Sequence, residues 1–209
     1  MDRGRSPVRL GVFGGTFDPV HVGHLAIAHA ALESVPLDRV LFVIARRSPL
    51  KERGPIASEA DRLRMLELAV AGEPRFAVSR VELDRDGPSY TVDTLEFLAG
   101  SDGRPSGGPD DLFLILGSDA IADLPRWKDP DRIARLATLV VADRPGAPER
   151  IGDAPVVRFD APRIDISSRE LRARAARGRS LRYLVPDPVW KHIKARGLYR
   201  AEGPTSGTS

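Results

Sequence analysis

Residues 8–24 read VRLGVFGGTFDPVHVGH, an apolar strand that leads through a glycine pair to the start of a helix. Gly14 and Gly15 allow the backbone to turn sharply and to approach a ligand without a Cβ in the way. Pro19 pre-sets a turn, and we expect a helix from about Val22. A strand, a tight turn and a helix make the first half of a βαβ unit, so this stretch predicts a parallel sheet.

The rest of the chain repeats this alternation. The expected strands are Val8–Phe13, Val40–Ala45, Phe76–Leu83, Leu112–Leu116, Thr138–Ala142 and Val156–Phe159. The expected helices are Val22–Ser34, Ser58–Ala71, Thr91–Ala99, Asp129–Leu136, Ser167–Arg177 and Asp187–Arg196. The short runs are apolar on both faces, as buried parallel strands are. The pattern predicts an α/β fold, a Rossmann-like doubly wound parallel sheet with helices on both faces and ligands at the carboxyl ends of its strands.

The length of 209 residues suits one α/β domain and is short for two. We expect a single domain over residues 8–200, in which about 167–200 form a small helical C-terminal subdomain. Residues 1–7, the loop 100–110 and the tail 201–209 are expected to be flexible. The sequence leaves the oligomeric state open.

The composition excludes several kinds of site. The chain has no cysteine, which rules out disulfides, thiolate metal ligands and cysteine nucleophiles. No apolar run approaches the roughly 20 residues of a membrane span. The N-terminus lacks the apolar region of a secretory signal, so we expect a cytoplasmic protein with no membrane partner.

Positive charge is dense in one stretch near the C-terminus. Its arginines are Arg163, Arg169, Arg172, Arg174, Arg177, Arg179 and Arg182. The solvated face of a helix explains such a stretch without a ligand. An arginine-rich RNA-binding module is the alternative. It gives no role to the histidines or the glycines, so we expect no nucleic-acid partner.

Three of the four histidines lie within nine residues, at His21, His24 and His29. His21 and His24 are three residues apart, so they share one face near the start of the helix. A helix N-terminus offers backbone N–H groups and a positive dipole end, both of which suit phosphate. Two imidazoles there can donate hydrogen bonds to phosphoryl oxygens. Zinc would need a third ligand, which is not evident, and packing alone does not explain the glycines.

A second helix start lies at residues 166–172, which read ISSRELR. Ser167 and Glu170 are spaced as a capping box. Arg169 and Arg172 lie in the first two turns, where the helix dipole disfavours cations. An ordinary capped helix does not explain this placement, whereas a bound polyanion would stabilise it.

The run GGTFDPVHVGH resembles the HxGH signature of the nucleotidyltransferase superfamily, with His21, Gly23 and His24 on the motif. Residues 166–172 are similar to the ISSxxxR motif of the same superfamily. The resemblance implies direct in-line attack on an α-phosphate, release of pyrophosphate and no covalent enzyme intermediate. The signature leaves open adenylyl transfer to nicotinate or nicotinamide mononucleotide or to phosphopantetheine, and also cytidylyl transfer.

The resemblance also implies the residues that bind ATP, with His21 and His24 as the catalytic pair. The expected ATP-binding residues are Gly14, Gly15, Thr16, Phe17, His21, Gly23, His24, Gly117, Asp119, Ile166, Ser167, Ser168 and Arg172. Asp119 is suited to accept a hydrogen bond from a ribose hydroxyl. No carboxylate cluster suggests a metal cage in the protein, so we expect Mg²⁺ to come with ATP, held by phosphates and water.

Three further stretches look like bacterial nicotinate-nucleotide adenylyltransferases: residues 89–95, 117–128 and 182–186. The resemblance runs from about Leu10 to Tyr199. It implies nicotinate mononucleotide as the acceptor and nicotinic acid adenine dinucleotide, a precursor of NAD, as the product. Nicotinamide mononucleotide and phosphopantetheine are the alternative acceptors.

The expected acceptor-binding residues are Lys51, Thr91 and Trp127. Trp127 can stack on a flat ring, and N–H groups at a helix start near Thr91 can bind a carboxylate. Lys51 matches the basic end of a Pro-Pro-His-Lys-like loop of the family. The loop departs from that pattern at three positions: Ala45, Ser48 and Leu50.

Overall fold

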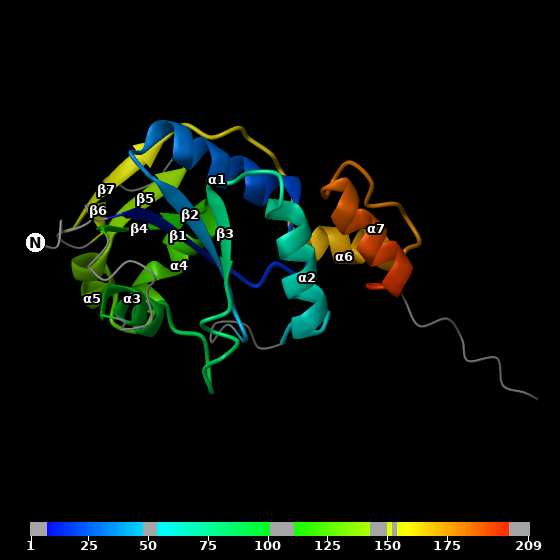
Figure 1. Ribbon diagram of the computed structural model, residues 1–209, viewed down its shortest axis with the longest axis horizontal. Helices are drawn as coiled ribbons and strands as arrows, with labels where there is room; N and C mark the ends of the chain where they lie inside the picture. Colours follow the sequence, from blue (N-terminus) through cyan, green and yellow to red (C-terminus); the bar gives the residue numbers. More distant parts are fainter. Residues whose placement is uncertain (1–7, 48–53, 101–110, 143–149, 152–153, 201–209) are drawn as a thin grey trace, which may run out of the picture.

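The computed structural model describes residues 8–47, 54–100, 111–142, 150–151 and 154–200. These residues contain one sheet, with strands in the order β3-β2-β1-β4-β5-β7-β6 (Figure 1). The strands are β1 (Arg9–Gly15), β2 (Arg39–Ile44), β3 (Phe76–Ser79), β4 (Asp111–Leu116), β5 (Thr138–Ala142), β6 (Arg150–Ile151) and β7 (Ala154–Phe159). Neighbouring strands are parallel, apart from β6, which is antiparallel to β7. The order reverses between β1 and β4, so the sheet is doubly wound as predicted.

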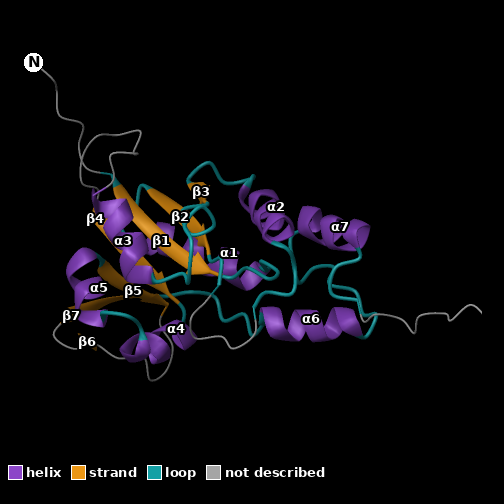
Figure 2. Cartoon of the chain, turned by 90° about the horizontal axis from the view of Figure 1, so that it is seen from below, coloured by secondary structure: helices purple, strands orange, loops and turns teal. Residues whose placement is uncertain are grey.

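Helices cover both faces of the sheet. They are α1 (Val22–Ser34), α2 (Glu59–Val70), α3 (Thr91–Gly100), α4 (Ser118–Asp123), α5 (Pro130–Leu136), α6 (Ser168–Ala176) and α7 (Asp187–Arg196), with a 3₁₀ turn η1 (Leu124–Arg126). Helices α1 and α2 lie on one face, and α3 and α5 lie on the other. Helix α7 packs against α2, and α6 lies at the same end of the molecule (Figure 2). The predicted Rossmann-like α/β fold is confirmed.

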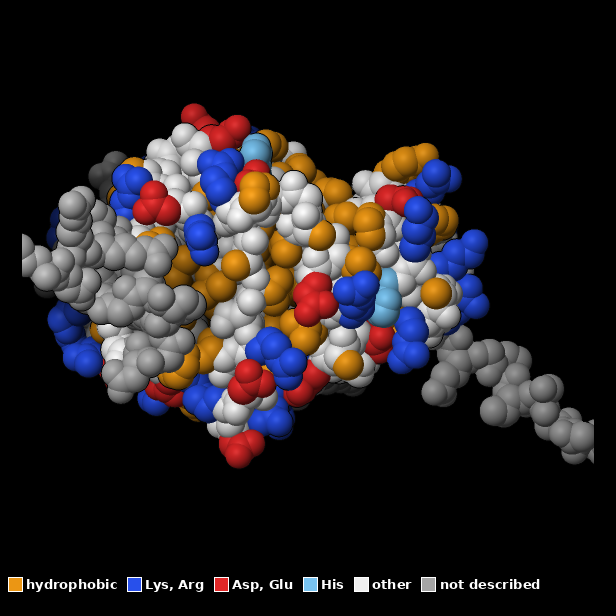
Figure 3. Space-filling view, in the orientation of Figure 1, with side chains coloured by type: hydrophobic (Ala, Val, Ile, Leu, Met, Phe, Trp, Pro, Cys, Tyr) orange, Lys and Arg blue, Asp and Glu red, His pale blue; other side chains and the backbone are white. Residues whose placement is uncertain are grey.

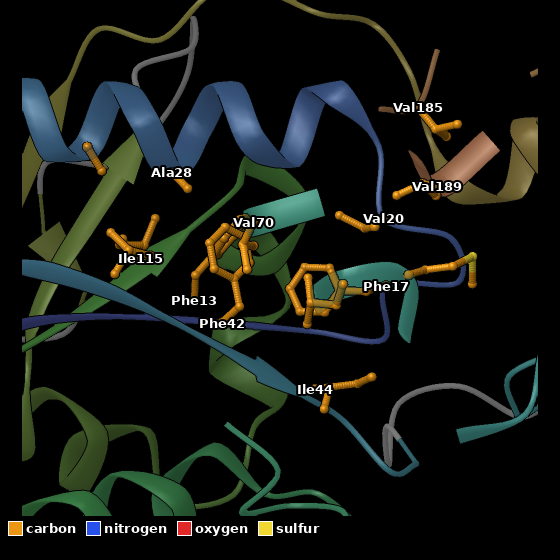
Figure 4. Packing of buried hydrophobic residues seen from close by; sticks show 14 of the residues in the cluster. Phe13, Phe17, Val20, Ala28, Phe42, Ile44, Val70, Ile115, Val185 and Val189 are labelled. Atoms are coloured by element: carbon orange, nitrogen blue, oxygen red, sulfur yellow. The ribbon is translucent and has the colours of Figure 1, made fainter. Parts of the chain in front are cut away.

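Alternate residues of β1 point into two separate hydrophobic cores, one on each face of the sheet. Val12 belongs to the core beneath α3 and α5. Phe13 belongs to the core beneath α1 and α2, which extends to Val189 of α7 (Figure 4). The carboxyl end of β1 is therefore held from both sides, and the loop that follows it starts from a fixed point.

The structure corrects the element boundaries in a few places. The strand expected over Phe76–Leu83 ends at Ser79, because the backbone then turns and the Leu83 N–H donates to the Arg80 carbonyl at 2.7 Å. The short elements α4, η1 and β6 were not predicted, since they hold too few residues to show a period. Residues 1–7, 101–110 and 201–209, where we expect flexibility, lie outside the described residues.

The division into domains stays a prediction. No helix in the described ranges is long and apolar enough to cross a membrane.

Candidate active site

His21 and His24 stand at the N-terminus of α1 with their rings stacked, at a centroid distance of 3.6 Å and an interplanar angle of 25°. His21 is the residue that precedes the helix. Its backbone N–H donates to Nδ1 of His24 at 3.2 Å. Because Nδ1 accepts this bond, a neutral His24 ring carries its proton on Nε2. The main chain thus selects the tautomer in which Nε2 is a hydrogen-bond donor.

His21 is held as a neutral ring. The residue is 6% exposed. Burial lowers the pKa of His21 from 6.5 to about 4, although the charge of Glu170 opposes the shift. Its Nδ1 is buried and has no hydrogen-bond partner within the described part of the chain. At neutral pH this imidazole can therefore offer a hydrogen bond but no positive charge.

Phe17 explains one of the two glycines before the histidines. Its ring meets His24 edge-on at 5.1 Å, and a Cβ on Gly15 would lie 2.8 Å from the Phe17 ring. Gly15 therefore makes room for the aromatic ring that supports His24. Gly14 is exposed, and a Cβ there would meet nothing within 4 Å. Packing does not require that glycine, so it is the one open to approach by a ligand.

Gly23 joins the two sequence motifs. A Cβ on this residue would lie 3.0 Å from Cγ2 of Ile166 and 3.1 Å from Nδ1 of His21. Both distances are shorter than ordinary contact, so any larger residue would push the two apart. The glycine of HxGH thus leaves room for both the first histidine and Ile166, the first residue of the second motif.

Two side chains of α6 hold the loop before α1. The Ser168 hydroxyl donates to the Pro19 carbonyl at 2.9 Å, across 149 residues of sequence. Arg172 Nη1 donates to the Asp18 carbonyl at 2.7 Å. The N-termini of α1 and α6 therefore lie together, which places two sets of helix-start N–H groups at one site.

The predicted capping box at the start of α6 is confirmed. Ser167 Oγ accepts from the Glu170 N–H at 3.2 Å, and the Glu170 carboxylate accepts from the Ser167 N–H at 3.0 Å. The box fixes the first turn of α6. It explains how Ser168 and Arg172 keep their direction toward the loop.

Asp18, which the sequence did not single out, is the centre of this loop. The Asp18 residue is 2% exposed. Its carboxylate accepts hydrogen bonds from the backbone N–H groups of Ile56 (2.8 Å) and Ala57 (3.1 Å). The Tyr199 hydroxyl donates to it at 2.8 Å, and Arg172 Nη1 lies 3.7 Å away. Burial raises the pKa of Tyr199, so the phenol stays a donor. One buried carboxylate thus joins the loop to α6, to the segment before α2 and to Tyr199 after α7.

Gly117 and Asp119 follow the neighbouring strand. Gly117 comes directly after β4 and precedes α4, and a Cβ on it would meet nothing within 4 Å. Because β4 pairs with β1, Gly117 lies at the same sheet edge as Gly14 and Gly15. Asp119 is in the first turn of α4. These residues flank the point where the strand order reverses, which is where doubly wound sheets bind ligands.

The predicted acceptor residues come from two segments that meet. Thr91 begins α3, and Trp127 follows η1, half-buried against the core beneath α3 and α5. Lys128 Nζ donates to Asp93 Oδ1 at 2.8 Å and lies 4.9 Å from the centroid of the Tyr90 ring. This lysine fastens the Trp127 segment to the start of α3. Lys51 and its loop, residues 48–51, lie outside the described residues.

Apart from Arg172, the arginine-rich stretch faces solvent. Its other members are all exposed: Arg163, Arg169, Arg174, Arg177, Arg179 and Arg182. Lys and Arg side chains also gather over α7 in Figure 3. Most of this charge therefore fits the solvated helix face that the sequence allowed.

Comparison with known proteins identifies the family. The sequence matches the cytidylyltransferase-like family model over residues 12–174. A probable nicotinate-nucleotide adenylyltransferase of Thermus thermophilus is 50% identical over 193 residues, covering 92% of this chain and 100% of that protein. One of Roseiflexus castenholzii is 48% identical over 201 residues, covering 92% and 98%. The chain belongs to the nicotinate-nucleotide adenylyltransferase family.

A solved adenylyltransferase structure has the same fold. The Plasmodium falciparum nicotinic acid mononucleotide adenylyltransferase complexed with NaAD superposes with a TM-score of 0.72. It covers 92% of this chain and 97% of its own, at 17% identity. At that identity the likeness concerns the fold.

The structure adds three buried residues that lie in or contact the loop after β1 and that the sequence did not single out: Asp18, Tyr199, and Arg62, whose Nη1 donates to the Thr16 carbonyl at 2.8 Å. Of these three, Arg62 could have been noticed from the sequence. It lies one turn before Met65 and Leu66 on the apolar face of α2, where a charged residue is unusual. Asp18 and Tyr199 meet across 181 residues of sequence, and no local pattern indicates such a pair.

Proposed function

We propose that this protein transfers the adenylyl group of ATP to nicotinate mononucleotide, giving nicotinic acid adenine dinucleotide and pyrophosphate in NAD biosynthesis. The observation that carries the proposal is the junction of the α1 and α6 helix starts through Ser168 and Arg172. It brings two imidazoles, an arginine and two helix N-termini to one place. Such a donor set matches a polyphosphate.

The proposed reaction is a direct displacement. A phosphate oxygen of the acceptor attacks the α-phosphorus of ATP, a new P–O bond forms, and the bond to the β-phosphate breaks to release pyrophosphate. His24 Nε2–H and the neutral His21 ring donate hydrogen bonds to the α-phosphoryl oxygens as charge develops there. The α6 start and Arg172 hold the leaving pyrophosphate. Neither histidine forms a covalent bond.

Mg²⁺ is proposed to enter with ATP. Among the described residues, no group of three His, Asp or Glu side chains lies close enough to hold a metal ion. The donors near α1 are N–H groups rather than oxygen ligands, so the ion fits on the triphosphate oxygens and water. Bound there, it would neutralise part of the triphosphate charge.

Two separate interactions are proposed to select the acceptor. Trp127 stacks on the flat pyridine ring, which nicotinate and nicotinamide share. The N–H groups at the start of α3, near Thr91, bind the nicotinate carboxylate. A neutral amide would present its own N–H₂ to these donors and leave them poorly paired. The acid is therefore the preferred acceptor. ATP and the mononucleotide are highly charged and cross membranes poorly, and we place the reaction in the cytoplasm.

Release of pyrophosphate tests the proposal. The protein is incubated with ATP and, separately, nicotinate mononucleotide, nicotinamide mononucleotide or phosphopantetheine. We expect kcat/KM with the nicotinate form to exceed that with the amide by at least about tenfold, which a carboxylate hydrogen bond of about 1.4 kcal/mol would produce. Preference for another acceptor would overturn the nicotinate assignment, and no release with any of them would overturn adenylyl transfer.

A further inference from the structure

Arg62 of α2 is fully buried at the carboxyl ends of β1 and β2. Its Nη1 donates to the Thr16 carbonyl at 2.8 Å and to the Ala45 carbonyl at 2.7 Å. Its Nη2 reaches the Arg46 carbonyl at 3.5 Å. One guanidinium therefore bonds the main chain just after β1 and the main chain just after β2.

The charge of Arg62 is kept despite its burial. Burial lowers the pKa of Arg62, and the negative charges of Asp18 and Glu59 oppose the shift, so the guanidinium remains protonated. Its Nε is buried and without a hydrogen-bond partner in the described ranges. An apolar side chain, such as those of Met65 and Leu66 on the same face, would fill this space without a desolvation cost. Filling space is therefore not a sufficient explanation for an arginine here.

Further hydrogen bonds continue from these loops to the proposed acceptor side. The Ala45 N–H donates to the Gly15 carbonyl at 2.8 Å. The Arg46 N–H donates to Ser89 Oγ at 3.0 Å, two residues before α3 begins at Thr91. Hydrogen bonds thus connect the loop after β1 to the end of β2, and the end of β2 to the residues before α3. Arg62 makes the first of these two connections.

We infer that Arg62 is a positioning residue for adenylyl transfer: it fixes the ATP-binding loop after β1 relative to the end of β2, from which a hydrogen bond leads to Ser89 before α3. The inference rests on the proposed function of the site. In-line attack needs the reacting atoms about 3–3.5 Å apart, and a misplacement of about 1 Å costs on the order of a hundredfold in rate. Arg62 donates hydrogen bonds to main-chain carbonyls after β1 and after β2. Loss of these bonds should therefore change the distance between the two bound reactants.

Three variants test the inference. Arg62→Met removes every donor and keeps an unbranched chain, whereas Arg62→Lys keeps the charge and can still bond some of the carbonyls. Leu66→Ala is the control, because it opens a cavity one turn away and leaves the carbonyl contacts in place. For Arg62→Met we expect kcat per folded enzyme to fall on the order of 10- to 100-fold. The KM values for ATP and the acceptor should each stay within about threefold. Arg62→Lys should recover part of kcat, and Leu66→Ala should lower the melting temperature without lowering kcat per folded enzyme.

Amide hydrogen exchange without substrates gives a second readout. The Ala45 amide, bonded to Gly15, should exchange at least about tenfold faster in Arg62→Met. The Val40 amide, bonded to the Arg75 carbonyl at the other end of β2, should not change. Leu66→Ala should leave the ratio of the two rates as in the parent.

The inference is overturned if Arg62→Met keeps kcat within about twofold of the parent, or if Leu66→Ala loses as much kcat per folded enzyme. If Arg62→Met does not fold, Arg62→Lys decides: unchanged kcat together with an unchanged Ala45 exchange rate contradicts the inference. If the parent protein releases no pyrophosphate, the proposed function is rejected instead. The amide exchange rate of Ala45 would still decide whether Arg62 holds the two loops together.

Discussion

The histidine side of the site is held by hydrogen bonds to the main chain, whereas the ion pair that joins the Trp127 segment to α3 lies between partly exposed side chains. Asp18 and His21 are 2% and 6% exposed, and Arg172 and Ser168 bond backbone carbonyls beside them. On the other side, the side chains of Lys128 and Asp93 are 46% and 31% exposed. Exposed ion pairs contribute little to stability. The proposed catalytic histidines are therefore placed by buried hydrogen-bonded groups, while the proposed acceptor side depends on a weaker contact.

This difference predicts different consequences of mutation. Changes on the histidine side should lower turnover or ATP binding, and changes on the Trp127 side should lower only the efficiency with the acceptor.

His24→Ala should lower kcat by on the order of a hundred- to a thousandfold and leave ATP binding nearly unchanged. The variant removes a donor that is preorganised for the transition state. Steady-state kinetics and equilibrium ATP binding separate the two effects. His29→Ala is the control, since His29 is exposed on the same helix and pairs with Glu33. A kcat within about threefold of the parent in folded His24→Ala would refute the role.

His21 should make the native state sensitive to acid. Unfolded, its pKa is 6.5, and in the native state burial holds it at about 4, so between these values the unfolded chain binds the extra proton. The stability due to the neutral ring is present above about pH 6.5 and is lost as the pH falls to about 4. The difference corresponds to about 3 kcal/mol. Denaturant unfolding of the parent and of His21→Gln at pH 7 and pH 4 measures it, and equal losses in both proteins would contradict the assignment.

Arg172→Ala should raise the KM for ATP by about 10- to 100-fold and leave the KM for the acceptor nearly unchanged. A hydrogen bond to a charged group contributes roughly 1.5–3 kcal/mol. Arg169→Ala, an exposed arginine on the same helix, should change neither constant. If the acceptor constant moves instead, the triphosphate does not lie at α6.

Trp127→Ala should lower kcat/KM by a similar factor, about three- to tenfold, for nicotinate and nicotinamide mononucleotides. Stacking depends on the ring that both acceptors share, so selectivity should stay as in the parent. The KM for ATP is the internal control and should not change. A loss confined to one acceptor would mean that Trp127 contacts the carboxylate or amide rather than the ring.

The sequence predicts features whose physical cause is local. The buried strands are visible as continuous apolar runs, and the Ser167–Glu170 capping box needs only four consecutive residues, so both predictions are confirmed. The end of β3 depends on a turn at Arg80, and α4 and η1 are too short to show a period. The contacts of Asp18 with Tyr199 and of Arg62 with Thr16 join residues 181 and 46 positions apart. Only the folded chain brings such residues together.

The difference between local patterns and long-range contacts also limits what the sequence says of the site. The histidine motif is contiguous, so its residues and their shared face are visible before folding. The expected acceptor side is assembled from the start of α3 and the segment after η1, which meet through Lys128 and Asp93. Thr91, Trp127 and Lys51 stay predictions as acceptor-binding residues, and Lys51 lies outside the described residues.

A single-turnover reaction with ATP labelled at the α-phosphate most directly tests direct adenylyl transfer to nicotinate mononucleotide. The protein is mixed with labelled ATP and this acceptor, quenched at short times, and the label is followed in protein, nucleotide and dinucleotide. We predict that the label passes from ATP to nicotinic acid adenine dinucleotide, with an equal amount of pyrophosphate and none on the protein. Label bound covalently to the protein before the dinucleotide forms, or no labelled dinucleotide at all, would contradict the account.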